Sequence, residues 1–167
     1  ITEYDIGLVR ISHVTPPGAP TGESVAITIH GAGFADYGTD QLKCRVGSMH
    51  LPGILQDSSR IVCNVRVPSL AQTLPVTVSL NNATIGTYSQ DIIDWTAYAP
   101  PVVTGVVPFE GDANGGTTVT VVGTGFTAFS SSYSLRRQLL RCRFGGEVQY
   151  ELPSYHNDTA IVCVTTW

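Results

Sequence analysis

Apolar and polar residues alternate along several short segments of the chain, with the period of a β-strand that has one face in a core. In the segment 24–34, one face carries Val25, Ile27 and Ile29, and the other carries Ala26, Thr28 and His30. The same alternation places these further residues on inner faces: Cys44, Val46, Ile61, Cys63, Val65, Val67, Val76, Val78 and Leu80. The pattern therefore predicts short strands rather than amphipathic helices.

The segment "SVAITIHGAGF" (24–34) is repeated as "TVTVVGTGF" (118–126), so a Gly-x-Gly-Phe sequence ends a strand pattern twice. Further along, "LKCRVG" matches "LRCRFG", and "SRIVCNV" matches "TAIVCVT". This self-similarity indicates two copies of one module. Neither Gly-x-Gly-Phe precedes a helical pattern or a Lys-Ser/Thr, as a phosphate loop would. We expect the glycines to serve a bulge or turn and the phenylalanine to return to the core.

Composition agrees with an all-β fold and excludes several function classes. The 17 glycines, 10 prolines and 13% charged residues suit strands joined by turns. The net charge of −4, with no Lys/Arg cluster beyond "LRRQLLRCR", argues against nucleic-acid binding. No apolar run approaches the ~20 residues of a membrane-spanning helix, so we expect no membrane span in this segment. Because the chain begins with Ile1 rather than Met, we expect a processed or excerpted piece of a longer product.

Four cysteines occur as two similarly spaced pairs, Cys44 with Cys63 and Cys142 with Cys163. Metal sites usually have tight C-x-x-C pairs with neighbouring histidines, and the sequence has neither. Inward cysteines on separate strands can meet beside a core, as a structural disulfide requires. We therefore predict two disulfides in an oxidising compartment. The alternative is four buried free thiols in a cytosolic protein.

Two longer stretches resemble the IPT/TIG family of immunoglobulin-like modules, which is known from plexins, Met-type receptors and Rel-type transcription factors. They are "VTPPGAPTGESVAITIHGAGF" and "VVPFEGDANGGTTVTVVGTGF", each followed by "CRVG" or "CRFGG" and a second cysteine. The resemblance covers nearly the whole chain and implies an all-β fold of two tandem immunoglobulin-like β-sandwiches, in residues 9–98 and 99–167. The cysteine pair resembles the extracellular branch of the family. The family serves adhesion, signalling, DNA binding and accessory roles in enzymes, so the resemblance leaves function open.

The second copy departs from the first after its second cysteine. The first copy continues for 35 residues to Tyr98, whereas only 164–167 follow Cys163. About thirty residues have no counterpart, so we expect the second module to lack its final strands. At the other end, 1–8 shows strand alternation in "ITEYDIGLV" before the first module begins.

These two departures have two explanations. In one, the chain is an excerpt of a longer tandem array, and 1–8 ends a preceding module. In the other, subunits polymerise head to tail, because the N-terminal strand of one enters the open second module of the next. The inserted strand would then carry Tyr4, Ile6 and Leu8. The acceptor core would be lined by Cys142, Phe144, Ile161 and Cys163.

No catalytic constellation is evident, and we expect neither a cofactor nor a metal site. The four histidines, His13, His30, His50 and His156, are scattered without metal-ligand spacing. Acidic residues in "FADYGTDQL" and "FEGDANGG" are read as solvated turns rather than as calcium loops. Two N-x-[ST] sequons, at Asn82 and Asn157, stand in predicted turns and are candidate N-glycosylation sites in a secreted protein.

The sequence thus favours a structural, non-catalytic role. We expect an extracellular, glycosylated, disulfide-stapled building unit of a fibre or adhesive stalk, whose partners are copies of itself or neighbouring modules. One alternative is a ligand-binding segment of a cell-surface receptor with tandem IPT/TIG repeats, which would bind through loops such as "GSMHLPG" (47–53). Another is an accessory module of a carbohydrate-active enzyme.

Overall fold

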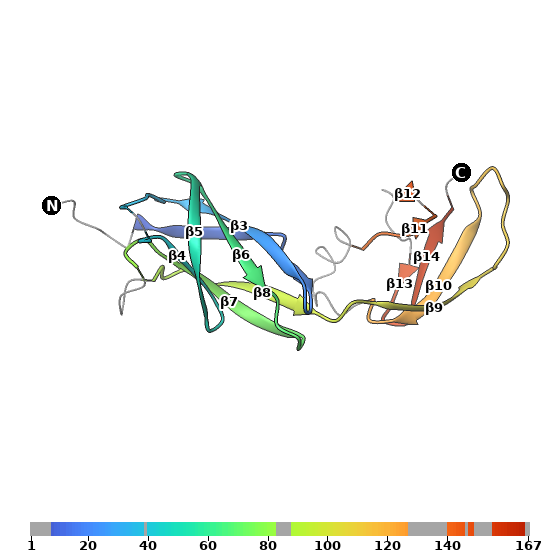
Figure 1. The fold of residues 1–167 in the computed structure, drawn as a ribbon. Helices are drawn as coiled ribbons and strands as arrows, with labels where there is room; N and C mark the ends of the chain where they lie inside the picture. The colour runs from blue at the N-terminus through green and yellow to red at the C-terminus, as the bar shows by residue number, and fades with distance from the viewer. Residues whose placement is uncertain are drawn as a thin grey trace. The chain divides into compact units, whose positions relative to one another are not determined.

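The computed structural model describes residues 8–38, 40–82, 88–126, 140–145, 147–148 and 155–165. Throughout these ranges the regular structure consists of β-strands, so the expected all-β fold is confirmed (Figure 1). No helix in the described part of the chain is long and apolar enough to cross a membrane. The chain divides into two compact units: unit 1 is Ile1–Tyr98 and unit 2 is Ala99–Trp167.

Unit 1 is a sandwich of two layers that share one strand, and all its strand pairs are antiparallel except β2 with β8, which is parallel. Its strands are β1 (Arg10–Thr15), β2 (Gly18–Pro20), β3 (Ser24–Ala32), β4 (Lys43–Val46), β5 (Met49–Asp57), β6 (Arg60–Arg66), β7 (Gln72–Ser79) and β8 (Ile93–Tyr98). One layer has the order β1-β3-β6-β5, and the other β5-β4-β7-β8-β2. Strand β5 joins both, because its first half pairs with β4 and its second half with β6. Residues 49–53, expected in a loop, therefore belong to this shared strand.

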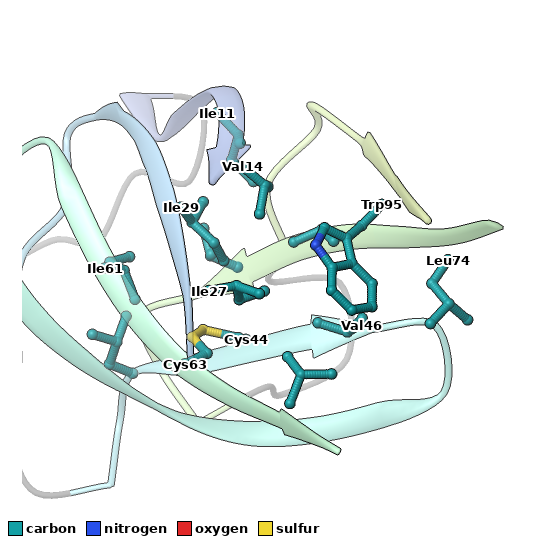
Figure 2. Close-up of a cluster of buried hydrophobic side chains, with 14 of the residues drawn as sticks. Ile11, Val14, Ile27, Ile29, Cys44, Val46, Ile61, Cys63, Leu74 and Trp95 are labelled. Carbon is teal, nitrogen blue, oxygen red and sulfur yellow. A yellow bond between two sulfur atoms is a disulfide. The ribbon is translucent and has the colours of Figure 1, made fainter. Parts of the chain in front are cut away.

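The core of unit 1 lies between these layers (Figure 2). The inward faces are those that the alternation predicted: Ile27, Ile29, Cys44, Val46, Ile61 and Val65 are all buried. Cys44 and Cys63 form a disulfide within this core, with their Cα atoms 6.5 Å apart. Trp95 of β8 is also buried, and its indole Nε1–H donates a hydrogen bond of 2.8 Å to the carbonyl oxygen of Pro16. Because buried indole N–H groups require an acceptor, this bond ties β8 to the turn that follows β1.

The Gly-x-Gly-Phe sequence of unit 1 allows β1 to approach β3 closely. A Cβ atom on Gly31 would overlap the carbonyl oxygen of Arg10 and lie 2.6 Å from the Phe34 ring. Gly33 has a φ of +75°, which glycine adopts without strain. The register between β1 and β3 shifts beside this point, and Phe34 is buried in the core. The expected bulge and returning phenylalanine are therefore confirmed.

Unit 2 repeats one layer of this architecture. Its strands are β9 (Val102–Val107), β10 (Thr118–Thr124), β11 (Arg143–Phe144), β12 (Glu147–Val148), β13 (Tyr155–His156) and β14 (Ala160–Val164). The sheet order β13-β14-β10-β9 corresponds to β5-β6-β3-β1, and β9 shifts register against β10 as β1 does against β3. The Cys142–Cys163 disulfide lies in a smaller core with Val119, Val121, Phe126 and Ile161. Among the residues that the structure describes in unit 2, β7 and β8 have no counterpart.

Candidate functional site

The outer face of the sheet, which points away from the core, differs between the two units. Cross-strand partners lie on the same side of a sheet, so the outward positions can be matched pair by pair. In unit 1 these positions carry Arg10, His13, His30, Arg60 and Asn64. The corresponding positions of unit 2 carry Val102, Gly105, Val122, Ala160 and Val164. A charged and polar face in unit 1 has thus become an apolar face in unit 2.

The outer face of unit 2 is defined as the outward side chains of β9, β10 and β14, none of which is charged. Four of its valines are substantially exposed: Val102 at 57%, Val107 at 64%, Val122 at 37% and Val164 at 39%. Antiparallel sheets usually carry polar residues on the side that faces water. Exposed apolar side chains gathered on one uncharged sheet face are typical of a contact with another protein. This face is the candidate interaction surface of the chain.

A second apolar area lies at the edge strand of unit 2, at Val103. In unit 1 the matching residue, Ile11, is only 6% exposed and belongs to the same core cluster as Trp95 of β8. There the Asp91 carboxylate accepts the Ile11 backbone N–H at 3.0 Å and pairs with the Arg10 guanidinium at 2.8 Å. Val103 is 58% exposed, and no described residue of unit 2 takes the place of Asp91.

The residues predicted to line an acceptor core are gathered together in unit 2. Cys142, Ile161 and Cys163 are buried and Phe144 is half-buried against the same cluster. The exposed apolar surface therefore lies on other side chains of β9, β10 and β14, not on these four. Of the predicted inserted strand, only Leu8 is described, and it is 69% exposed. Tyr4 and Ile6 lie outside the described residues, so strand insertion stays a prediction.

Both sequon asparagines are exposed and stand in turns. Asn82 follows β7 with a φ of +62°, and its backbone N–H donates to the carbonyl oxygen of Gln41. The Oδ1 of Asn157 accepts hydrogen bonds from the backbone N–H groups of Thr159 and Ala160, at 2.8 and 2.7 Å. A glycan is attached through Nδ2 and would leave these bonds to Oδ1 intact. Glycosylation at either residue stays a prediction.

Titratable residues form no catalytic or three-ligand metal cluster within the described ranges. The acidic loops are turns in which a carboxylate bonds the backbone two residues on, as Asp36 does to Gly38 and Asp112 to Asn114. The Nδ1 of His50 lies 2.7 Å from the Tyr88 hydroxyl. The expectation that the histidines are scattered is wrong for one pair, since the rings of His13 and His30 stack 4.2 Å apart. They were missed because 17 positions separate them, and only the β1–β3 register brings them together.

Comparisons with known proteins agree with this architecture. A family profile described as IPT/TIG domain matches residues 10–92 and 101–166. Plexin-B2 of Mus musculus is 30% identical over 117 residues, which are 68% of this chain and 6% of that protein. Fibrocystin-L of Mus musculus is 24% identical over 159 residues, which are 95% of this chain and 4% of that protein. The chain thus spans a small fraction of the length of these curated relatives.

Two solved structures of the plexin A4 extracellular region share the fold. They have TM-scores of 0.51 and 0.53 at 20% identity, and each covers 95% of this chain. The chain covers 13% and 15% of those structures, respectively. Together with two disulfides, which persist in oxidising environments, these relatives show that the chain is extracellular. Because the family profile matches both units, the chain belongs to the IPT/TIG domain family, of which it carries two tandem copies.

Proposed function

We propose that this chain is a non-catalytic, protein-binding segment in the extracellular region of a large receptor-like cell-surface protein. The carrying observation is the outer face of unit 2, where valine, glycine and alanine replace the arginines and histidines of unit 1 at matched positions. Similarity to plexin extracellular regions supports the receptor-like setting. Unit 1, with its closed core and polar outer face, serves as a spacer.

The surface suits a protein partner better than a charged or sugar ligand. It presents Val107, Val122 and Val164 among threonines on a sheet without a charged side chain. Such a face packs well against another sheet or a flat apolar surface, where the layers approach to about 10 Å. Carbohydrates and nucleic acids would require polar or cationic side chains, which this face lacks. An N-glycan at Asn157 would stand on the turn between β13 and β14, at an end of the strands rather than along them.

The test is binding of the secreted chain to cells, with a matched substitution in each unit. We would tetramerise the biotinylated chain on fluorescent streptavidin and stain a panel of mouse cell lines, since the relatives are mouse proteins. Val164→Arg should abolish staining because it places a cation in the apolar face. The control, Asn64→Arg, makes the same change at the matched position of unit 1 and should leave staining unchanged. Equal staining by the wild type and Val164→Arg, or none by the wild type, would contradict the proposal.

The fibre unit remains the second candidate, because apolar surface at Val103 offers an edge to which a strand could add. Sedimentation velocity of the wild-type chain separates the two functions. A receptor segment sediments as a monomer or small oligomer, whereas a self-assembling unit forms large particles without any other protein. Deletion of residues 1–8 should abolish such particles if the N-terminal strand is the inserted element. Particles that survive this deletion would rule out strand insertion.

A further inference from the structure

His13 and His30 form a pair on the outer face of unit 1. His13 lies on β1 and His30 on β3, and the two are direct cross-strand partners. Their ring centroids are 4.2 Å apart and their planes are 3° from parallel. The next residue along β1, Val14, and the preceding residue of β3, Ile29, are buried in the core. The two imidazoles therefore stand together on the solvent side of the sheet.

Ser12 determines which nitrogen of His13 carries the proton. Its Oγ donates its single proton to the carbonyl oxygen of His30 at 3.1 Å. The 3.0 Å contact between Ser12 Oγ and His13 Nδ1 must then use the Nδ1–H as donor. This leaves the lone pair of His13 on Nε2. Metal-binding histidines almost always donate their second N–H to an oxygen in this manner, which orients the ring and fixes the tautomer.

Several ionisable groups surround His30 on the outer face of unit 1. Burial lowers the pKa of His30 below its usual 6.5, and the neighbouring His13 and Arg60 lower it further, whereas Asp57 on β5 raises it. Arg60 is the cross-strand partner of His30 on β6, and its guanidinium is bound by the Asp57 carboxylate at 2.6 Å. The neutral imidazole is the form that binds a metal ion. Within the described residues, no hydrogen bond occupies a ring nitrogen of His30.

We propose that His13 and His30 together chelate one divalent transition-metal ion of the kind that imidazole prefers, Zn²⁺ or Cu²⁺. Metal–imidazole bonds of about 2.0–2.1 Å place two adjacent ligand nitrogens about 3 Å apart. The rings are stacked 4.2 Å apart and nearly parallel, so their in-plane lone pairs do not converge, and metal binding requires both side chains to turn about their Cα–Cβ and Cβ–Cγ bonds until one nitrogen of each points at the ion. Water, or side chains of a binding partner, complete the coordination. The site should bind Cu²⁺ more tightly than Zn²⁺, following the general order of metal affinities.

The first test is a Zn²⁺ titration of the secreted full-length chain by isothermal calorimetry at pH 7.5. We expect one ion per chain, and each of His13→Ala and His30→Ala should weaken binding at least about tenfold, because each removes one of two ligands. Ser12→Ala keeps both ligands but removes the hydrogen bond that fixes the tautomer of His13. It should weaken metal binding by about tenfold or less. The control, His50→Ala, removes a histidine on the other layer and should change nothing. All three histidines lie at the surface, so circular dichroism should show intact folds.

The second readout identifies the ligands directly. Electron paramagnetic resonance of the Cu²⁺ complex should show two equivalent imidazole nitrogens in the wild type and one in His13→Ala. Affinity should fall in acid, since protons compete for the same nitrogens. Wild-type affinity retained in both His13→Ala and His30→Ala would overturn the proposal, and so would an equal loss in His50→Ala. Absence of Zn²⁺ binding at millimolar concentration would also overturn it.

Discussion

Replacement of Ile11 by alanine tests whether the segment that leads into β8 covers the edge strand of unit 1. Ile11 is 6% exposed and belongs to the core cluster that contains Trp95 (Figure 2). The chain provides a control in the same unit: Ile54 of β5 is 56% exposed. Both substitutions remove the same three carbon atoms from a strand, so their difference measures burial alone.

The expected destabilisation follows from the buried atoms. Three buried carbons contribute about 2.4 kcal/mol at about 0.8 kcal/mol per methylene. A cavity adds to this loss, but β1 is the outermost strand of its layer and can relax inward. We therefore expect Ile11→Ala to lower the free energy of unfolding by about 2–3 kcal/mol, near the lower end for such substitutions. Ile54→Ala should change it by less than about 0.5 kcal/mol.

Trp95 reports on unit 1, since its side chain is fully buried. The chain contains two tryptophans, so a Trp167→Phe background leaves Trp95 as the single tryptophan, which can be excited selectively in urea titrations. With an m value of about 1 kcal/mol/M for a unit of this size, the midpoint should fall by about 2–3 M in Ile11→Ala. An unchanged m value would show that the substitution acts on stability. If Ile11→Ala shifts the midpoint no more than Ile54→Ala, the β8 segment does not cover β1 and the reasoning is refuted.

Three further tests probe other features of unit 1. Gly31→Ala should lower the free energy of unfolding of unit 1 by about 3 kcal/mol or more in the same titration, because its Cβ would overlap backbone of β1. Asp91→Ala should lower the free energy of unfolding by about 1–3 kcal/mol because a β1 amide loses its acceptor. Arg10→Ala removes only the partly exposed ion pair and should lower it by less than about 1 kcal/mol. The pKa of His30 is lowered in the folded state, so as the pH falls the unfolded state binds the proton before the folded state does. The contribution of His30 to the free energy of unfolding should therefore be constant above about pH 6.5 and fall below it. His30→Asn should reduce this fall in urea titrations at pH 7.5 and 5.5.

Much of the strand pattern was predictable from local sequence. Alternation identified the inward residues of β3, β4 and β6, because a strand exposes alternate side chains to opposite faces whatever its partner. The repeat predicted two similar modules, and the glycines before Phe34 and Phe126 predicted a bulge and a buried ring. The difference between the outer faces of the two units is also visible in the aligned repeats, where Val122 stands at the position of His30. That difference has meaning only once the register shows which side of the sheet each residue faces.

Other features of the fold could not be predicted from local sequence, because they depend on pairing between strands that are far apart in the chain. Strand β5 was partly missed because Pro52 and Gly53 read as a loop, yet at this point the strand passes from β4 to β6. The contact between His13 and His30 depends on a register that no local pattern specifies.

The sequence by itself determined the two modules, their strands and inward faces, and the residues available for disulfides, because these depend on periodicity and residue type. The tertiary structure decided that the Ile11 side chain is buried while Val103 is exposed, and that His13 and His30, which are distant in sequence, stack. It also decided that the valines of unit 2 share one uncharged face. The physical reason is that burial and side-chain proximity are set by which strands pair and in which register, and those choices join residues far apart in the chain.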